Sequence, residues 1–299
     1  MITTQLAPIA LFCYNRPLHL QETLEALRRN PLASQSELVV FADGPKDEAD
    51  AILVREVRAL LDGTQGFGHT KIKVAEHNQG LARSVIKGVS ELLENHEKVI
   101  VLEDDMLCTT DFLDYMNSVL TVYQGRPDIF SVTGYTPPIS LPAAYGEEVY
   151  LVPRASSWGW GTWRDRWRKA DWQVEGFEKI RADSGFRNRM EAGGEDLWPM
   201  LVKQQRGQID SWAIRWTYSQ VQHQAYGLYP AKSKIKNIGT DGSGTNFTFK
   251  TAAYGQELVE GNLSLPPDLQ PEPTVVEAFR RFYSLPWRVK LKNRIKHGI

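Results

Sequence analysis

The first 105 residues alternate between short apolar runs and segments whose apolar residues have helical spacing. The apolar runs cover residues 9–14, 38–42, 72–75 and 99–102. Between them, apolar residues recur every three or four positions, as at Leu20, Leu24 and Leu27. Short apolar runs separated by amphipathic helices are typical of βαβ units, which build a parallel sheet covered on both faces. The sequence therefore predicts the α/β class, with a mainly parallel, Rossmann-like central sheet and helices on both of its faces.

Polar or glycine-containing loops follow all four predicted strands. These loops read Asn15-Arg16, Asp43-Gly44, Asn78-Gln79-Gly80 and Glu103-Asp104-Asp105. In open parallel sheets, ligands bind in the crevice beyond the carboxyl ends of the strands. We therefore expect the four loops to line a binding site, although loops that follow strands are often polar for solubility alone.

The acidic triplet 103–105 has the chemistry of a metal site. In an extended strand alternate side chains share a face, which predicts that Glu103 and Asp105 point one way and Asp104 the other. Paired carboxylates at a strand end supply the hard oxygen ligands that Mg²⁺ or Mn²⁺ prefers, and such a metal would also hold a diphosphate. It would neutralise the charge that develops on a departing nucleoside diphosphate. A solvated acidic cap would have the same sequence.

Other nucleotide-binding and catalytic signatures are missing from the sequence. The first strand is followed by Asn15-Arg16-Pro17 rather than by the glycine-rich turn of dinucleotide-binding proteins. The chain also lacks the phosphate-binding loop that ends in Gly-Lys-Ser/Thr. Its six histidines are scattered, and their spacing indicates neither a zinc hydrolase nor a serine hydrolase.

The composition is that of a globular protein. The 299 residues include 42% hydrophobic and 24% charged residues, and the net charge of -1 argues against a dedicated nucleic-acid binder. The two cysteines, Cys13 and Cys108, are far apart and suit a reducing compartment. The apolar run at residues 9–14 is too short for a signal peptide, and no basic residue precedes it. We therefore expect a cytoplasmic protein.

Tryptophan is concentrated in one part of the chain, with eight of the nine residues between Trp158 and Trp216. Flat aromatic rings stack on the apolar faces of sugars, and glycine allows a backbone to approach a ligand closely. In the segment Ser156–Trp163 we therefore expect Trp158, Gly159 and Trp160 to contact a sugar. Three further tryptophans are expected in the core: Trp163, Trp167 and Trp172.

The C-terminal region is rich in proline and then in basic residues. Four prolines between residues 263 and 273 predict a segment that wraps around the domain. Residues 280–299 contain seven Arg or Lys and no acid, whereas residues 1–279 carry a net charge of -8. After Pro286 we expect a short helix with Trp287, Leu291 and Ile295 on one face. Its cations could bind an anionic membrane surface, or they could pack against the acidic domain.

Taken together, these motifs resemble the nucleotide-diphospho-sugar transferases of the GT-A fold. The resemblance is strongest to the N-acetylglucosaminyltransferase I group and its bacterial relatives in surface-polysaccharide synthesis. It spans about residues 8–250, and its most specific motif is the acidic triplet at a strand end. The matching segments are Cys13-Tyr-Asn-Arg-Pro17, Ala42-Asp-Gly44, Asn78-Gln-Gly-Leu81, Glu103-Asp-Asp105, Trp158-Gly-Trp160 and Asn237-Ile-Gly-Thr-Asp-Gly-Ser-Gly244.

The resemblance implies roles for individual residues. It makes Asp105 the ligand of Mn²⁺ or Mg²⁺ and implies inversion at the anomeric carbon by direct displacement. That reaction needs a carboxylate base for the acceptor hydroxyl, and the candidates are Asp210, which could instead be a helix N-cap, and Asp196. The residues expected to bind the nucleotide-sugar are Asn15, Arg16, Asp43, Gly44, Asn78, Gly80, Glu103 and Asp104.

The predicted organisation is one GT-A domain with a C-terminal extension. Residues 1–105 form the nucleotide-sugar-binding half, residues 106–265 the acceptor-binding half, and residues 266–299 the wrapping segment and basic tail. The predicted function is metal-dependent transfer of a sugar to a glycan or lipid-linked acceptor. Two alternatives stay open: a catalytically silent domain that binds a nucleotide-sugar or glycan, and a nucleotidyltransferase that makes the sugar nucleotide.

Overall fold

The computed structural model describes residues 5–242, 251, 253–261 and 264–297. Strands and helices alternate up to residue 103, as the sequence predicts. The elements of this half are β1 (Ile9–Cys13), α1 (Pro17–Arg28), the 3-10 helix η1 (Ala33–Gln35), β2 (Glu37–Ala42), α2 (Glu48–Asp62), β3 (His69–Val74), α3 (Leu81–Asn95) and β4 (Lys98–Glu103).

The second half is less regular. Its elements are β5 (Met106–Cys108), α4 (Phe112–Val122), β6 (Ile129–Thr133), β7 (Val149–Val152), β8 (Trp160–Trp163), α5 (Arg164–Trp167), α6 (Phe177–Arg181), α7 (Ser184–Ala192), α8 (Leu197–Gln205), α9 (Trp212–Gln222), β9 (Tyr226–Pro230), β10 (Ile235–Asn237), the 3-10 helix η2 (Gly239–Asp241), α10 (Pro273–Phe282) and α11 (Trp287–His297).

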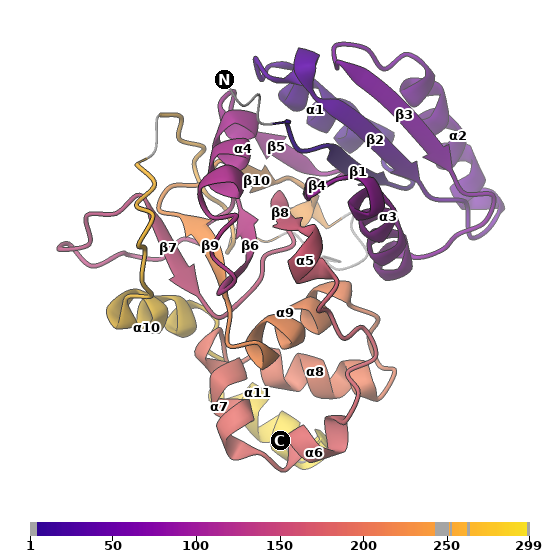
Figure 1. The fold of residues 1–299 in the computed structure, drawn as a ribbon. Coiled ribbons are helices and arrows are strands. Elements are labelled where there is room, and N and C mark those ends of the chain that lie inside the picture. Colours follow the sequence, from indigo (N-terminus) through magenta and orange to yellow (C-terminus); the bar gives the residue numbers. More distant parts are fainter. Residues whose placement is uncertain (1–4, 243–250, 252, 262–263, 298–299) are drawn as a thin grey trace.

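The main sheet has eight strands in the order β3-β2-β1-β4-β8-β6-β9-β7 (Figure 1). The first four strands are parallel to one another, β8 is antiparallel to both β4 and β6, and β9 is parallel to β6. The strands β1 to β4 form βαβ units. Each connection between them contains a helix that is long enough to bring the chain back to the start of the next parallel strand. The predicted sheet, mainly parallel and flanked by helices, is confirmed.

Two hydrophobic cores lie on opposite faces of this sheet. Ile9 and Leu11 of β1 pack with α1, α2 and α4, whereas Ala10 and Phe12 pack with α3 and α9. The same alternation continues in β4, whose residues divide between the two cores. Burial on both faces explains why these strands are continuously apolar in the sequence.

A small second sheet lies beside the carboxyl ends of the parallel strands. The chain turns at residues 104–105 after β4 and enters β5, which pairs with β10 in antiparallel orientation. This pairing places Asn237 opposite Met106. Residues that are 131 positions apart are thereby brought to the point where β4 ends.

The C-terminal segment wraps around the second half of the domain. The hydroxyl group of Tyr123 donates to the carbonyl of Pro266 at 2.8 Å, and Arg126 donates to the carbonyls of Pro267 and Leu269. Helix α10 covers β7, and α11 packs near α8 (Figure 1). Within the described part of the chain, no helix has the length and apolar character needed to cross a membrane.

Candidate functional site

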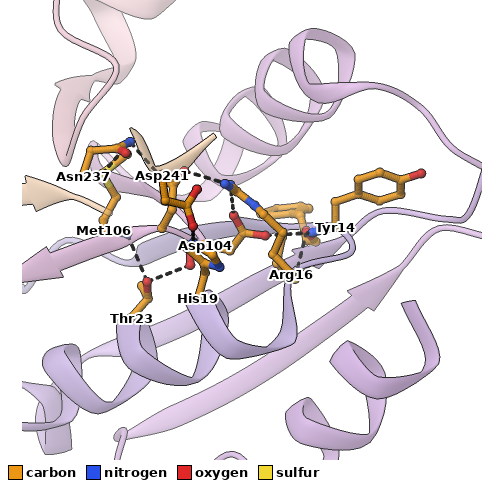
Figure 2. A network of polar contacts seen from close by, with 11 residues as sticks. Tyr14, Arg16, His19, Thr23, Asp104, Met106, Asn237 and Asp241 are labelled. Carbon is orange, nitrogen blue, oxygen red and sulfur yellow. Dashed lines mark hydrogen bonds and ion pairs between the residues drawn. The ribbon is translucent and has the colours of Figure 1, made fainter. Parts of the chain in front are cut away.

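Arg16 joins the two aspartates that follow β4. Its Nη2 donates to Asp104 Oδ1 at 2.5 Å and to Asp105 Oδ2 at 2.8 Å (Figure 2). The expectation that Asp104 points away from Asp105 is therefore wrong. Alternation of side chains holds only for extended backbone, and β4 ends at Glu103, so the two aspartates lie in a turn.

The acids of this site are buried, and burial changes their protonation. Asp104 is 3% exposed and Asp105 is 6% exposed. Burial, reinforced by Asp105 and Asp104, raises the pKa of Glu103 to about 8. Burial also raises the pKa of Asp104 to about 6, although Arg16 opposes this shift. Burial therefore favours the protonated forms of Glu103 and Asp104, and Arg16 partly offsets this effect at both acids.

A threonine on α1 holds the turn that carries these aspartates. Thr23 Oγ1 donates to the carbonyl of Asp104 at 2.8 Å and accepts from the N–H of Met106 at 3.0 Å. The N–H of Tyr14 adds a bond to Asp104 Oδ2 at 3.2 Å. Thr23 is fully buried and was not predicted as a site residue. The one feature of the sequence that could have indicated Thr23 is its hydroxyl, which lies on the otherwise apolar face of α1.

The segment after β10 packs against the acid pair. Asn237 Nδ2 donates to Asp105 Oδ1 at 3.2 Å, and the N–H of Ile238 donates to the Asp105 carbonyl at 2.9 Å. A Cβ at Gly239 would lie 2.1 Å from Asp105 Oδ2, so only glycine fits there. His19 and Asp241 form an ion pair at 3.2 Å nearby (Figure 2). Of the sequence motif 237–244, Ser243 and Gly244 lie outside the described residues.

The oxygen atoms at this site fit a hard divalent cation. The Oδ1 of Asn237 is buried and has no hydrogen-bond partner among the described residues, and it belongs to the same amide that contacts Asp105. Carboxylate and amide oxygens are the ligands that Mg²⁺ and Mn²⁺ use. No three His, Cys, Asp or Glu side chains gather as a metal cluster in the part of the chain that the structure describes. Among the described residues, Asp105 and the Asn237 amide oxygen are groups that could hold a cation, and Arg16 lies beside both aspartates.

Asp43 joins the loops after β2 and β3. Its Oδ1 accepts from the N–H groups of Gly44 and Gln79, at 2.8 and 2.7 Å. Its Oδ2 accepts from Asn78 Nδ2 at 3.1 Å and from the N–H of Gly80 at 3.0 Å. Four donors fill the usual capacity of a carboxylate. The structure thus brings together the residues predicted in these two loops and bonds them to one another.

The glycines of these loops have distinct backbone roles. A Cβ at Gly44 would lie 2.5 Å from the backbone of His77, so the two loops approach too closely for a side chain. Gly80 precedes α3 with a φ of 77°, a left-handed conformation that glycine adopts readily. Both residues therefore shape the loops through the backbone.

Asn15 is held by an aspartate that the sequence did not single out. Asn15 Nδ2 donates to Asp50 Oδ1 at 2.8 Å, and the hydroxyl of Tyr14 donates to Asp50 Oδ2. The bond from Tyr14 is the main reason why the pKa of Asp50 is lowered. Asp50 lies in the first turn of α2, and no sequence signal links it to the loop after β1.

The aromatic segment before β8 differs from the sequence prediction. Trp160 is 1% exposed and stacks on Trp212, with ring centroids 4.8 Å apart. Its ring is part of the core and cannot stack on a sugar, so this prediction is wrong. Gly159 has a φ of 53°, and its missing Cβ leaves room for Ile235 of β10 rather than for a ligand.

Trp158 is the one predicted sugar-binding side chain in this segment that stays partly exposed. Its ring meets Tyr135 edge-on at 4.5 Å and Tyr254 at 5.7 Å. Trp163 and Trp167 lie in the core as predicted, with exposures of 1% and 4%. Trp172 is half-buried and packs against the core that contains Trp167.

The two candidate bases have different surroundings. Asp210 has a 70% exposed side chain with an ion pair to Arg215 at 2.8 Å. Ser211, not Asp210, caps α9, because its Oγ accepts from the N–H of Ile214. Asp196 receives two hydrogen bonds from Arg154, at 2.7 and 2.8 Å. In the described ranges, the side-chain hydrogen bonds of Asp210 and Asp196 lead to Arg215 and Arg154, and not to the site at Arg16 and Asp105.

The solved structures that are similar to this chain are distant. A mannosyltransferase from Pyrobaculum calidifontis, solved with GDP-Man and Mn²⁺, is 15% identical with a TM-score of 0.37, and the match covers 54% of this chain. S. aureus TarS is 13% identical with a TM-score of 0.39, and the match covers 78% of this chain. The matches span 46% and 37% of those two chains, which is less than half of each. A search of curated protein sequences finds no match.

A protein-family model gives the decisive comparison. The model described as glycosyl transferase family 2 matches residues 9–183, which contain β1 to β8 and the acidic triplet. This match confirms the predicted relation to nucleotide-sugar transferases of the GT-A fold, whereas the narrower likeness to the N-acetylglucosaminyltransferase I group stays a prediction. Since the match covers more than half of the 299 residues, the chain belongs to glycosyl transferase family 2.

Proposed function

We propose that this chain is a metal-dependent, inverting glycosyltransferase that moves a sugar from a nucleoside diphosphate to a glycan or lipid-linked acceptor. The observation that carries the proposal is the buried Asp104–Asp105 pair, which Arg16, Asn237 and Gly239 enclose. We place the reaction in the synthesis of surface polysaccharides on the cytoplasmic side of the membrane, following the resemblance described above.

The donor diphosphate would bind where β4 ends. Asp105 and the Asn237 amide oxygen would hold Mn²⁺ or Mg²⁺, which when bound neutralises charge on the leaving diphosphate. Arg16 offers a planar set of N–H donors that suits phosphate oxygens. Two of its bonds, to Asp104 and Asp105, already orient it. Asn15, fixed by Asp50, would face the nucleoside.

Asp210 is the proposed general base. A base must reach the acceptor hydroxyl and take its proton. The carboxylate of Asp210 is largely exposed, and Asp210 precedes by two positions Trp212, which stacks on Trp160 where β8 begins. Asp196 is tied by both oxygens to Arg154, an arrangement that suits a structural ion pair better. Trp158 would pack against the acceptor or donor sugar.

Thermal unfolding with ligands tests the donor and metal parts of this proposal. Wild-type protein is melted with Mn²⁺ and each of a panel of UDP- and GDP-sugars, because a ligand at 100 times its dissociation constant adds about 2.7 kcal/mol to stability. We expect at least one sugar nucleotide to raise the melting temperature only with metal. Asp105→Asn should abolish that metal-dependent shift without lowering the ligand-free melting temperature. Asp62→Asn, at an exposed acid at the end of α2, is the control.

The outcomes separate the proposed function from its alternatives. No shift with any sugar nucleotide would contradict the donor assignment, and an unchanged shift in Asp105→Asn would contradict the metal assignment. A shift without release of nucleoside diphosphate in the presence of acceptors would favour the silent binding domain. Formation of a sugar nucleotide from a nucleoside triphosphate and a sugar phosphate would favour the nucleotidyltransferase.

A further inference from the structure

Helix α11 turns its apolar side chains away from the protein. Trp287, Leu291 and Ile295 are 68%, 50% and 76% exposed. Their spacing of four residues places them in one stripe along the helix. A helix that served only to cover its own domain would turn such a stripe inward, because exposed apolar surface is unfavourable in water.

Polar contacts attach the opposite side of α11 to the domain. Lys290 forms an ion pair with Glu195 at 2.8 Å, and Asn293 is 6% exposed. Glu195 also accepts from the N–H of Leu285, just before the helix. The polar residues therefore set the orientation of α11, which lies near α8 (Figure 1). Its apolar stripe stays exposed.

Cations border the outward stripe. Arg288 and Lys292 precede Leu291 and Ile295 by three positions each, so they lie next to the stripe, and both are exposed. Residues 280–299 contain seven Arg or Lys and no acid, whereas the rest of the chain carries -8. Three of these cations pair with acids: Arg280, Arg281 and Lys290. Arg288 and Lys292 are the exposed cations beside the apolar stripe.

We infer that the outward face of α11 docks this protein on an anionic lipid bilayer. A tryptophan and two aliphatic side chains would enter the boundary between headgroups and acyl chains, and the cations beside them would meet lipid phosphates. This mode of contact needs no membrane-spanning segment. The sequence left two alternatives open: the tail binds a membrane, or it packs on its own domain. We assign both roles to α11, with its polar side packed on the domain and its apolar side on the membrane.

Charge argues against a second copy of the chain as the occupant. A two-fold symmetric contact places the same patch on both subunits. Two α11 faces would then bring the exposed Arg288 and Lys292 of one copy toward the same cations of the other. An anionic surface has the complementary charge.

Vesicle co-sedimentation of the full-length protein tests this inference without any substrate, so its result is independent of the proposed function. We expect binding to vesicles of phosphatidylethanolamine and phosphatidylglycerol at low salt, weaker binding at high salt, and no binding to phosphatidylcholine alone. The triple variant Trp287→Ser, Leu291→Ser and Ile295→Ser and the double variant Arg288→Glu and Lys292→Glu should each lower the partition coefficient by about tenfold or more.

Matched controls lie on α2 and α3. Ile52→Ser with Leu53→Ser removes exposed apolar side chains, and Arg55→Glu with Lys87→Glu makes the same change of net charge. Both controls should bind vesicles as the wild type does. If the wild type does not sediment with anionic vesicles, or if controls and α11 variants bind equally, the inference is wrong. A dimer that depends on α11, without vesicle binding, would assign the face to a second copy and overturn it as well.

If the substitutions in α11 unfold the helix, a deletion of residues 287–299 tests the same inference. The deletion leaves α10 and its buried Phe279 in place. Circular dichroism and thermal melting show whether the shortened domain is folded. A folded protein that still binds anionic vesicles would contradict the assignment to α11.

Discussion

At the scale of single residues, the site depends on a hydroxyl that contacts no proposed ligand. Thr23 is buried on the inner face of α1 and satisfies two backbone groups of the turn at residues 104–106. A buried carbonyl or N–H without a partner costs about 1–3 kcal/mol. The position of both aspartates beside Arg16 is therefore coupled to a residue that is 82 positions away in the sequence from Asp105.

Replacing Thr23 by valine keeps its shape and removes its hydroxyl. We expect Thr23→Val to lower the free energy of unfolding by about 1–3 kcal/mol and to weaken Mn²⁺ binding, whereas Thr23→Ser should preserve both. Urea unfolding and an electron paramagnetic resonance titration of Mn²⁺ measure the two effects. Equal metal affinity in the valine and serine variants would show that the turn does not need this hydroxyl.

The two candidate bases allow a test that separates chemistry from stability. Asp210→Asn should lower kcat by about 100-fold or more, the usual scale for loss of a positioned base, with the KM for the donor and the melting temperature unchanged. Asp196→Asn should mainly lower the melting temperature, because it breaks the ion pair with buried Arg154. A stable Asp196→Asn variant with the lower kcat, beside a fully active Asp210→Asn, would transfer the role to Asp196.

At the scale of elements, the sequence predicts the strands that have a local apolar pattern. It misses contacts between residues that are far apart in the chain. The run at residues 99–102 became β4 (Lys98–Glu103) because burial on both faces requires a continuous apolar strand. Trp160 was misjudged because β8 inserts between β4 and β6, and a core tryptophan has the same sequence as a sugar-binding one. Thr23 and Asp50 became visible only when distant loops met, and Asn237, which lies in a segment of the family resemblance, had no predicted role.

One such long-range link is the ion pair between α4 and β10. Lys234 has a side chain that is 2% exposed, and it donates to Asp111, at the start of α4, and to the carbonyl of Gly261. Burial alone would raise the pKa of Asp111, but the hydrogen bonds from Lys234 and Thr109 lower it below its usual value. Asp111 therefore stabilises the fold above its ordinary pKa near 4, and this contribution is lost as the pH falls through the lowered value.

Removing one partner of this pair should cost more than removing both. We expect Asp111→Ala to lose about 3 kcal/mol, at the low end for buried pairs, because a quarter of the Asp111 side chain is exposed. Adding Lys234→Met should recover at least half of that loss. Urea unfolding at several pH values measures both effects, and the difference between wild type and Asp111→Ala should shrink below about pH 4. A difference that stays constant down to pH 2 would rule out this role for the Asp111 charge.

At the scale of the whole molecule, the C-terminal segment lies outside the family match at residues 9–183 and covers one end of the main sheet. Phe279 of α10 is fully buried, with its ring 5.1 Å from that of Tyr229 and 6.2 Å from that of Tyr150. Helix α10 thereby holds β7, the edge strand, and its neighbour β9.

Removing that ring should loosen one end of the molecule. We expect Phe279→Ala to lose about 3–5 kcal/mol of stability, with hydrogen-exchange protection falling first in β7, β9 and α10. Phe279→Leu should lose less than about 1.5 kcal/mol, because it nearly conserves volume. If β1 to β4 lose hydrogen-exchange protection to the same extent, the sheet unfolds as one unit. Helix α10 would then not stabilise one end of the sheet separately.

The position of β4 in the sheet has a consequence for biosynthesis. β4 is the fourth strand of eight in the finished protein, but its outer neighbour, β8, ends at Trp163, 60 residues after Glu103. Chains grow at about 5–20 residues per second, so a newly made β4 waits for about 3–12 s with one edge unpaired. An apolar strand with a free edge is a template for aggregation. During this interval the Val-Ile-Val-Leu edge of β4 is exposed on the nascent chain, and ribosome-bound chaperones could shield it. The interval ends when β8, with its tryptophans, pairs with this edge.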